Sequence, residues 1–234
     1  MKKIFLATFL LFSVALFAQK AKPKLKSKGA TATVVAPIET KKSDETLVEI
    51  TTNYGVMIAR LYNSTPLHKE NFTKLVQQGF YDSLLFHRVI AGFMLQGGDP
   101  TSKNADANAM LGGGENVGQP MVAAEFRNNL IHKKGALAAA RDGNAEKKSS
   151  NCQFYIVQGK KTDTAQLGAG NNYTATQKEI YQRIGGTPFL DQNYTVFGEI
   201  FIGLDVIDKI AAVKCGNADR PIENIRMKMR IINN

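Results

Sequence analysis

The stretch Phe-His-Arg-Val-Ile-Ala-Gly-Phe-Met-Leu-Gln-Gly-Gly-Asp-Pro-Thr, residues 86–101, decides the fold of this 234-residue chain. Its first half predicts a strand, and the Ala-Gly pair that follows predicts a turn. Before the turn, a two-residue period places Arg88 and Ile90 on one strand face. After the turn, Met94 and Gln96 again share a face. The stretch therefore predicts a small apolar bowl with a guanidinium and an amide aimed across it.

This group of side chains suits a reaction without a covalent step. The stretch contains no paired carboxylates, no activated serine or cysteine and no cluster of metal ligands. It offers a hydrogen-bond donor beside an apolar pocket of about the size of a proline ring. Rotation of an Xaa-Pro bond faces a barrier of roughly 18–20 kcal/mol from amide resonance. A donor to the imide nitrogen binds the twisted state better than the planar one. We therefore expect prolyl isomerisation with Arg88 as the donor, and no cofactor or metal.

Many unlike residues coincide here at fixed spacing: Phe-His-Arg-Val-Ile at 86–90, Gly-Phe-Met at 92–94 and Gln-Gly-Gly-Asp at 96–99. This pattern resembles the signature of cyclophilin-type peptidyl-prolyl isomerases. The resemblance covers about residues 45–232, less an insertion. It implies a mainly β fold, a closed eight-stranded antiparallel β-barrel with two capping helices. An apolar core with an arginine on its rim is the plainer alternative for the opening stretch.

The resemblance also implies the site residues. Its catalytic residues would be Arg88, Gln96 and His87, of which His87 need not be a general base because the reaction moves no proton. We expect His87 to be a pocket wall and a hydrogen-bonding neighbour, and Gln153 to donate and accept near the peptide. The substrate-binding residues implied are Phe93, Met94, Ala140, Arg141, Gln153, Tyr155, Phe189, Leu190 and Tyr194.

Four of these positions depart from the family pattern. Arg141 stands where the family usually has Asn, and we expect tolerance with altered preference, because backbone groups commonly hold the substrate there. Tyr155 replaces the more usual Phe, which should be nearly neutral. Tyr194 stands where many members carry His. Phe189 stands where many carry Trp and lacks the indole N–H donor, which leaves strong binding of the drug cyclosporin open.

The chain begins with a predicted secretory signal peptide at residues 1–18. Two lysines precede an apolar run that is short for a bilayer span and ends at the small residue Ala18. We expect cleavage there, export to the periplasm or beyond the cell, and no stable membrane insertion afterwards. An uncleaved anchor is the alternative.

Residues 19–43 predict a flexible, lysine-rich linker that carries most of the charge. The formal net charge is +10, of which the two leader lysines contribute +2 and the linker contributes +6, from seven lysines against Glu39. Residues 44–234 are thus left with +2, so we do not expect nucleic-acid binding.

Residues 44–234 predict one isomerase domain, a monomer that acts on proline-containing polypeptides, unfolded or newly exported. Strands are expected at 46–52, 56–62 and 222–232, and helices at 66–78, capped by Thr65, and at 203–213. An insertion at about 160–187 should hold a short amphipathic helix at 176–184.

The remaining candidate groups add no second site. His68 and His132 lack metal-ligand spacing, so we expect ordinary surface residues. For Cys152 and Cys215 we expect two free buried thiols, with a disulfide between them as the alternative. Two other functions stay open. One is a binding module or chaperone that keeps the pocket but does not accelerate isomerisation, and the other is a metal or hydrolytic enzyme that uses His87.

Overall fold

The structure, a computed structural model, describes residues 45–115, 118–163, 165, 167 and 172–232. All of them belong to one unit, residues 42–234. The predicted signal peptide (1–18) and linker (19–43) lie outside the described residues.

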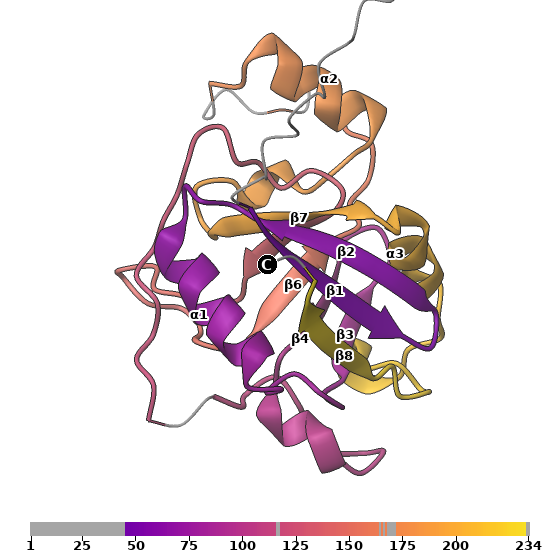
Figure 1. Cartoon of the computed structure of the whole chain (residues 1–234). Coiled ribbons are helices and arrows are strands. Elements are labelled where there is room, and N and C mark those ends of the chain that lie inside the picture. The colour runs from indigo at the N-terminus through magenta and orange to yellow at the C-terminus, as the bar shows by residue number, and fades with distance from the viewer. Residues whose placement is uncertain (1–44, 116–117, 164, 166, 168–171, 233–234) are drawn as a thin grey trace, which may run out of the picture. The chain divides into compact units, whose positions relative to one another are not determined.

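Eight antiparallel strands form one sheet in the order β3-β4-β6-β5-β7-β2-β1-β8 (Figure 1). As the two-residue alternation predicts, the first two strands form a hairpin, with Thr46 opposite Leu61 and Thr52 opposite Gly55. The strands are β1 Thr46–Thr52, β2 Gly55–Leu61, β3 Phe86–Ile90, β4 Met94–Gly97, β5 Ala136–Ala139, β6 Phe154–Val157, β7 Val196–Ile202 and β8 Met227–Ile231.

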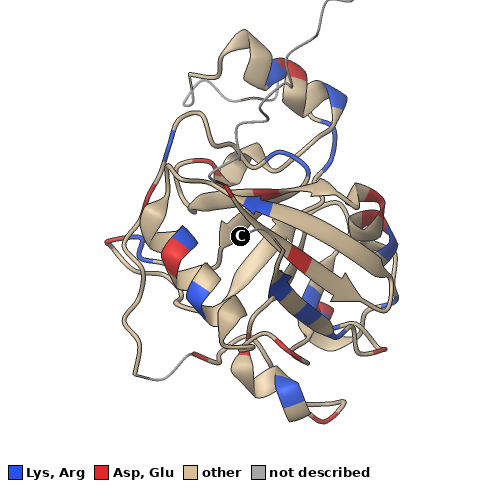
Figure 2. Cartoon of the chain, in the orientation of Figure 1, with Lys and Arg blue, Asp and Glu red and all other residues tan. Residues whose placement is uncertain are grey.

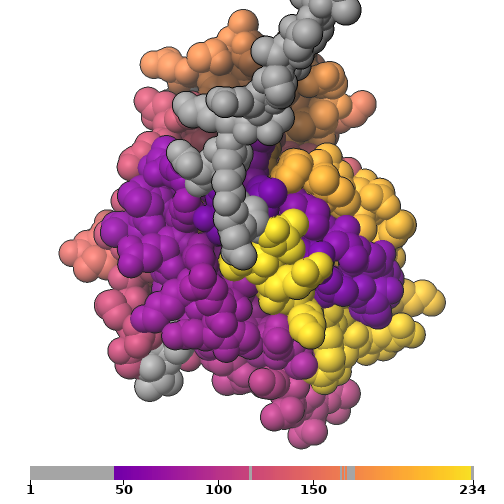
Figure 3. Space-filling model, viewed as in Figure 1, coloured from indigo at the N-terminus to yellow at the C-terminus, as the bar shows by residue number. Residues whose placement is uncertain are grey.

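The sheet ends at β3 and β8, which share no ladder in the part of the chain that the structure describes. Just before these strands, Leu85 and Arg226 form an isolated antiparallel bridge. The backbone N–H of Phe86 also donates to the carbonyl of Ile225 at 2.9 Å. At the surface, β8 lies against β1 of the N-terminal hairpin (Figure 3). The mainly β fold is therefore confirmed, whereas a fully closed barrel stays a prediction.

Three helices accompany the sheet: α1 Pro66–Gln77, α2 Ala175–Arg183 and α3 Leu204–Ala211. Each begins within one residue of its predicted start. In Figure 1, α1 and α3 lie beside the sheet, and α2 stands apart from it. Apolar residues on one side of α1 (Phe72, Leu75) and of α3 (Ile207) enter the main core. The two capping helices and the insertion helix are thus where the sequence placed them.

Alternation along the central strands separates two apolar clusters. Leu95 pairs with Ile156, which pairs with Leu137, and all three are fully buried in the main core. Their neighbours Met94, Tyr155 and Ala138 belong instead to a second cluster. Because successive side chains point to opposite faces of a strand, this second cluster lies on the outer face of the same strands.

The N-terminus of α1 is capped differently from the prediction. Thr65 makes no side-chain cap hydrogen bond. The carboxylate of Glu125 instead accepts the backbone N–H groups of Leu67 and His68 at 3.2 and 3.0 Å. It also lies 2.7 Å from His68 Nδ1, while Nε2 lies 3.0 Å from Ser149 Oγ. His68 is buried, so its expected place at the surface is wrong.

Basic and acidic residues alternate along the ribbon without gathering in one element, as the blue and red segments of Figure 2 show. Arg230 on β8 pairs with Glu49 on β1 at 2.7 Å. Within the described residues, no helix combines the length and hydrophobicity that a membrane span requires. Both cysteines are free thiols, as expected, but only Cys152 is buried, whereas Cys215 is exposed.

Candidate active site

The strand register places the predicted catalytic pair together. Arg88 on β3 is opposite Gln96 on β4, Gln96 is opposite Tyr155 on β6, and Tyr155 is opposite Ala138 on β5. Opposed residues in antiparallel strands point to the same face. A row of side chains therefore crosses four strands on the outer face, with the guanidinium at one end and the small residue Ala138 at the other.

A cavity of about 220 Å³ opens on this row. It is smaller than the roughly 300–1,000 Å³ of pockets for drug-sized ligands, and so suits one ring or side chain. Seven of the nine predicted substrate-binding residues line it, the exceptions being Gln153 and Phe189. The full lining is Arg88, Phe93, Met94, Gln96, Ala140, Arg141, Tyr155, Leu190 and Tyr194.

Arg88 lies at the mouth of this cavity. Its side chain is 41% exposed, and Nε lies 3.3 Å from Asp219 Oδ2. Among the described residues, neither terminal nitrogen of Arg88 has a hydrogen-bond partner. Arg88 and Gln96 also border a second cavity of about 970 Å³, lined mainly by residues 107–112 and 216–222. The guanidinium thus stands between two hollows, with its terminal N–H groups available to a ligand.

Gln153 holds Gln96 in place. The Gln96 Nε2 donates to Gln153 Oε1 at 3.0 Å, and the Gln153 Nε2 donates to the carbonyls of Gly112 and Gly114, each at 2.8 Å. Gln153 is buried, and both ends of its amide are engaged. We expected it to donate and accept near the peptide, and direct contact with the peptide stays a prediction. Its contacts make it a support for Gln96.

Asp99 organises the glycine-rich loop that carries those two carbonyls. Its carboxylate accepts the backbone N–H groups of Gly112, Gly114 and Thr101 and the Thr101 hydroxyl. Burial raises the pKa of Asp99, but these hydrogen bonds, that from the Thr101 hydroxyl foremost, outweigh it and lower the pKa below its usual value. A Cβ at Gly114 would collide with the Asp99 carboxylate. The loop therefore needs glycine there, a requirement that sequence reasoning missed.

His87 does not act as a hydrogen-bonding neighbour. It is buried and lines the larger cavity, not the smaller one. Within the described part of the chain, neither ring nitrogen has a hydrogen-bond partner. Burial lowers the pKa of His87 to about 4, so the ring is neutral at neutral pH. No group of three or more potential metal ligands occurs among the described residues.

Two further predicted residues shape the rim. Phe189 is 67% exposed, and its ring centroid lies 5.6 Å from that of Phe93, a lining residue. The Arg141 guanidinium lies 4.7 Å over the Tyr194 ring, and its Nε donates to the Asn193 carbonyl at 2.9 Å. The side chain of Arg141 thus braces Tyr194, one wall of the cavity.

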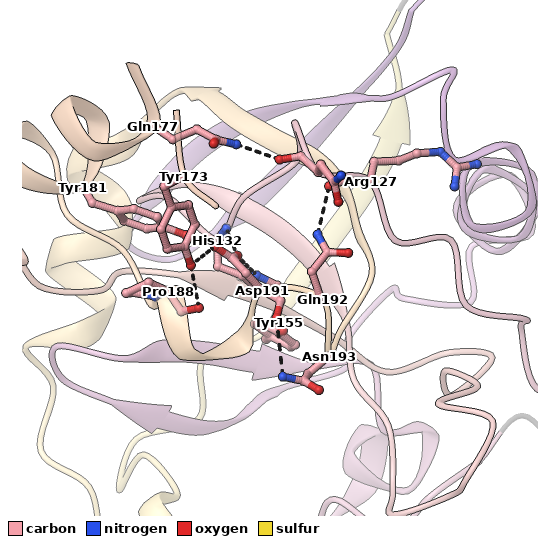
Figure 4. Close-up of polar contacts among 11 residues, drawn as sticks. Arg127, His132, Tyr155, Tyr173, Gln177, Tyr181, Pro188, Asp191, Gln192 and Asn193 are labelled. Atoms are coloured by element: carbon pink, nitrogen blue, oxygen red, sulfur yellow. Dashed lines mark hydrogen bonds and ion pairs between the residues drawn. The ribbon is translucent and has the colours of Figure 1, made fainter. Parts of the chain in front are cut away.

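A buried polar network stands behind another wall, Tyr155 (Figure 4). His132 Nε2 lies 2.9 Å from the Tyr155 hydroxyl, and Nδ1 lies 2.7 Å from Asp191 Oδ1. His132 is fully buried, so its expected surface position is wrong. Sequence reasoning missed the network, because the Asp191 partner is 59 residues away and neither residue belongs to a periodic pattern.

With this geometry in place, comparisons with known proteins identify the family. The family model described as cyclophilin type peptidyl-prolyl cis-trans isomerase/CLD matches residues 47–231. A Staphylococcus aureus protein named as a peptidyl-prolyl cis-trans isomerase is 36% identical over 184 residues, 77% of this chain and 88% of that one. A Staphylococcus epidermidis protein with the same name is 35% identical over 187 residues, 79% and 90% of the two chains.

Solved structures agree. A crystal structure of a cyclophilin type peptidyl-prolyl cis-trans isomerase from Cryptosporidium parvum superposes with a TM-score of 0.61 at 25% identity, covering 81% of this chain and 99% of that one. A second structure of that protein, in the presence of the dipeptide Ala-Pro, gives a TM-score of 0.60 at 25% identity over 80% and 99%. The chain therefore belongs to the cyclophilin-type peptidyl-prolyl cis-trans isomerase family.

Proposed function

We propose that this isomerase accelerates Xaa-Pro rotation without a covalent step, with Arg88 donating a hydrogen bond to the proline imide nitrogen. The observation that carries the proposal is the position of Arg88, whose terminal N–H groups are unpaired among the described residues at the mouth of an apolar cavity. The guanidinium stays charged and donates without accepting. It therefore favours the twisted imide, whose nitrogen lone pair has left conjugation, over the planar one.

A charged hydrogen bond of this kind contributes about 1.5–3 kcal/mol net, which corresponds to roughly a 10- to 150-fold change in rate. The remaining acceleration must come from the grip of the cavity on the ring. Phe93, Met94 and Leu190 supply apolar surface there, and Gln96, held by Gln153, stands next to Arg88. We assign Gln96 the task of orienting the guanidinium and the peptide.

We further propose proline-containing segments of unfolded polypeptides as substrates. The smaller cavity takes one ring, and the larger one beyond Arg88 leaves room for the residues that flank it. One solved relative was crystallised in the presence of the dipeptide Ala-Pro, which favours the same class of ligand for this chain. We expect a monomer without nucleic-acid affinity, in keeping with the charge of +2 that residues 44–234 carry out of +10 in total.

The test is a proline-peptide isomerisation assay on the purified protein. Catalysed isomerisation that Arg88→Ala reduces by a factor in the range above would support the proposal. Full activity in Arg88→Ala would refute the proposed role of Arg88, but the assignment of the chain to its family would stand. Peptide binding without acceleration in the wild-type protein would favour a binding module instead.

We propose that the chain is exported before it acts. The support is the leader alone: Lys2 and Lys3, the apolar run and Ala18 at its end. Mass spectrometry of the protein from the cell envelope or medium should find Gln19 as the first residue. A protein found with its leader intact in the cytoplasm would contradict this.

A further inference from the structure

The insertion between β6 and β7 takes no part in the chemistry proposed above, yet its side chains end beside the pocket. Tyr181, in α2, is fully buried, and its hydroxyl donates to Asp191 Oδ2 at 2.6 Å. Tyr173, just before α2, donates to the same oxygen at 2.8 Å, and its hydroxyl also lies 3.1 Å from the Pro188 carbonyl oxygen. Asp191 directly follows Leu190, which lines the cavity. Two hydroxyl groups of the insertion thus converge on one carboxylate at the pocket wall (Figure 4).

The insertion is firmly attached to the rest of the domain. The backbone N–H of Lys134 donates to the Gly185 carbonyl at 3.0 Å, and that of Thr187 donates to the His132 carbonyl at 2.8 Å. Tyr181 packs with Ile131 and Leu167 in a small apolar cluster. The two tyrosine hydroxyls are therefore held at fixed positions by their own surroundings.

The other oxygen of Asp191 faces His132. Oδ1 accepts the backbone N–H of His132 at 2.8 Å and lies 2.7 Å from Nδ1. The carboxylate thus has four hydrogen-bond partners, and its side chain is only 2% exposed. An ionised carboxylate has no proton to give, so Nδ1 carries the proton and donates. A buried charge is tolerable when all of its acceptor positions are filled in this way.

The tautomer of His132 in turn determines whether the Tyr155 hydroxyl donates or accepts the hydrogen bond between the two side chains. A neutral imidazole with its proton on Nδ1 presents a lone pair at Nε2. The Tyr155 hydroxyl, 2.9 Å away, must then be the donor. The Tyr155 ring meets the ring of Tyr194 edge-on, with centroids 5.9 Å apart, and both line the cavity. The Asp191 carboxylate therefore fixes the Tyr155 wall of the cavity through His132.

We propose that the insertion is a positioning element of the active site, which fixes Asp191 and, through Asp191 and His132, the Tyr155 wall of the proline pocket. The inference rests on the proposed function and adds the residues that hold its pocket in shape. Within the described structure, neither tyrosine of the insertion lines the cavity. Tyr173 and Tyr181 are therefore positioning residues and not catalytic ones.

A double-mutant cycle on the full chain tests this coupling. Tyr181→Phe should lower kcat/KM for a tetrapeptide containing Ala-Pro by about three- to tenfold. The loss should appear mostly as a raised KM, because the wall contacts the ring in the planar and the twisted states alike. In a Tyr155→Phe background the same substitution should change kcat/KM by less than about twofold, since the hydroxyl that receives the constraint is gone.

Controls separate positioning from folding. Tyr54→Phe removes a tyrosine hydroxyl in the β1–β2 turn, outside the site, and should leave kcat/KM unchanged. Tyr173→Phe is a milder second variant should Tyr181→Phe unfold the chain, and it should follow the same pattern. The inference is overturned if kcat/KM stays at the wild-type value in both variants. It is equally overturned if the loss is the same with and without the Tyr155 hydroxyl.

The proposed catalysis can fail while the positioning role of the insertion holds, and the experiment distinguishes the two outcomes. If the wild-type chain binds the tetrapeptide but does not accelerate its isomerisation, the same cycle is read from the dissociation constant of the peptide. If Tyr181→Phe raises that dissociation constant three- to tenfold, and does so only when the Tyr155 hydroxyl is present, the insertion positions the pocket even though the chain is not a catalyst. A wild-type chain that does not bind the peptide overturns both.

Discussion

Replacing Asp191 by asparagine should destabilise the domain by about 3 kcal/mol, a loss that can be worked out from its four contacts. The carboxylate accepts two hydrogen bonds from His132 and two from tyrosine hydroxyls. The amide of asparagine keeps one oxygen and turns the other acceptor into an NH₂ donor. Facing His132 with its oxygen, it would point the NH₂ group at Tyr173 and Tyr181.

Two hydrogen bonds to a charged acceptor are then lost or weakened, at about 1.5–3 kcal/mol each. The upper sum of about 6 kcal/mol is not expected, because the tyrosine hydroxyls can rotate and accept from the amide. The lower sum, about 3 kcal/mol, remains. For a domain of this size, 1 kcal/mol lowers Tm by about 2–4 °C, so calorimetry should find Tm lower by about 6–12 °C.

Asp208→Asn is the matched control. Asp208 is a half-exposed carboxylate on α3 that pairs with Lys134 at the surface, and loss of such a pair changes stability by about 0–1 kcal/mol. Urea or thermal unfolding of both variants at pH 7 makes the comparison. If the free energies of unfolding of Asp191→Asn and Asp208→Asn differ by less than about 1 kcal/mol, the view that Asp191 is a buried charge with all of its acceptor positions filled is refuted.

Three other outcomes follow from the structure. The folded-state pKa of His87 is about 4, below the ordinary 6.5, so the unfolded chain binds this proton first. About 3 kcal/mol of the free energy of unfolding, fully present above pH 6.5, is therefore lost as the pH falls to 4. In His87→Gln the free energy of unfolding should fall less steeply between pH 6.5 and pH 4. The same steepness as in the wild-type chain would contradict this. Gly114→Ala should lower kcat/KM several-fold by displacing the loop that holds Gln153, and a fully active variant would show that Asp99 yields instead. One thiol per native chain, the exposed Cys215, should react with a thiol reagent, and two reacting thiols would contradict the burial of Cys152.

The sequence predicted the parts of the site that depend on alternation and local turns. Arg88 and Gln96 are two side chains of a regular hairpin, so their common face follows from a period of two and the Ala-Gly turn between the strands. The three helices followed from apolar spacing and from Pro66 at the start of the first. These features rest on neighbours within a few residues, which a sequence displays directly.

The parts that the sequence did not reveal depend on contacts between distant residues. His68 and His132 are buried because Glu125 and Asp191, 57 and 59 residues away, accept their hydrogen bonds. Nothing in a lone histidine, whether in a helix like His68 or in a loop like His132, marks such a partner. Gln153 was expected to donate and accept near the peptide, and its contacts with backbone carbonyls of a distant glycine-rich loop were not foreseen. The residues of this network are nevertheless close in sequence around the insertion: Tyr173 and Tyr181 lie within it, and Asp191 follows it.

The central claim is that Arg88 binds the twisted imide better than the planar one, and its most direct test compares kcat with peptide affinity in Arg88→Ala. The account predicts that kcat falls by roughly 10- to 150-fold, with Arg88→Lys intermediate because it keeps the charge without the fork of donors. The dissociation constant of the ground-state peptide should change by less than about threefold. An unchanged kcat, or a loss confined to peptide binding, would contradict the account.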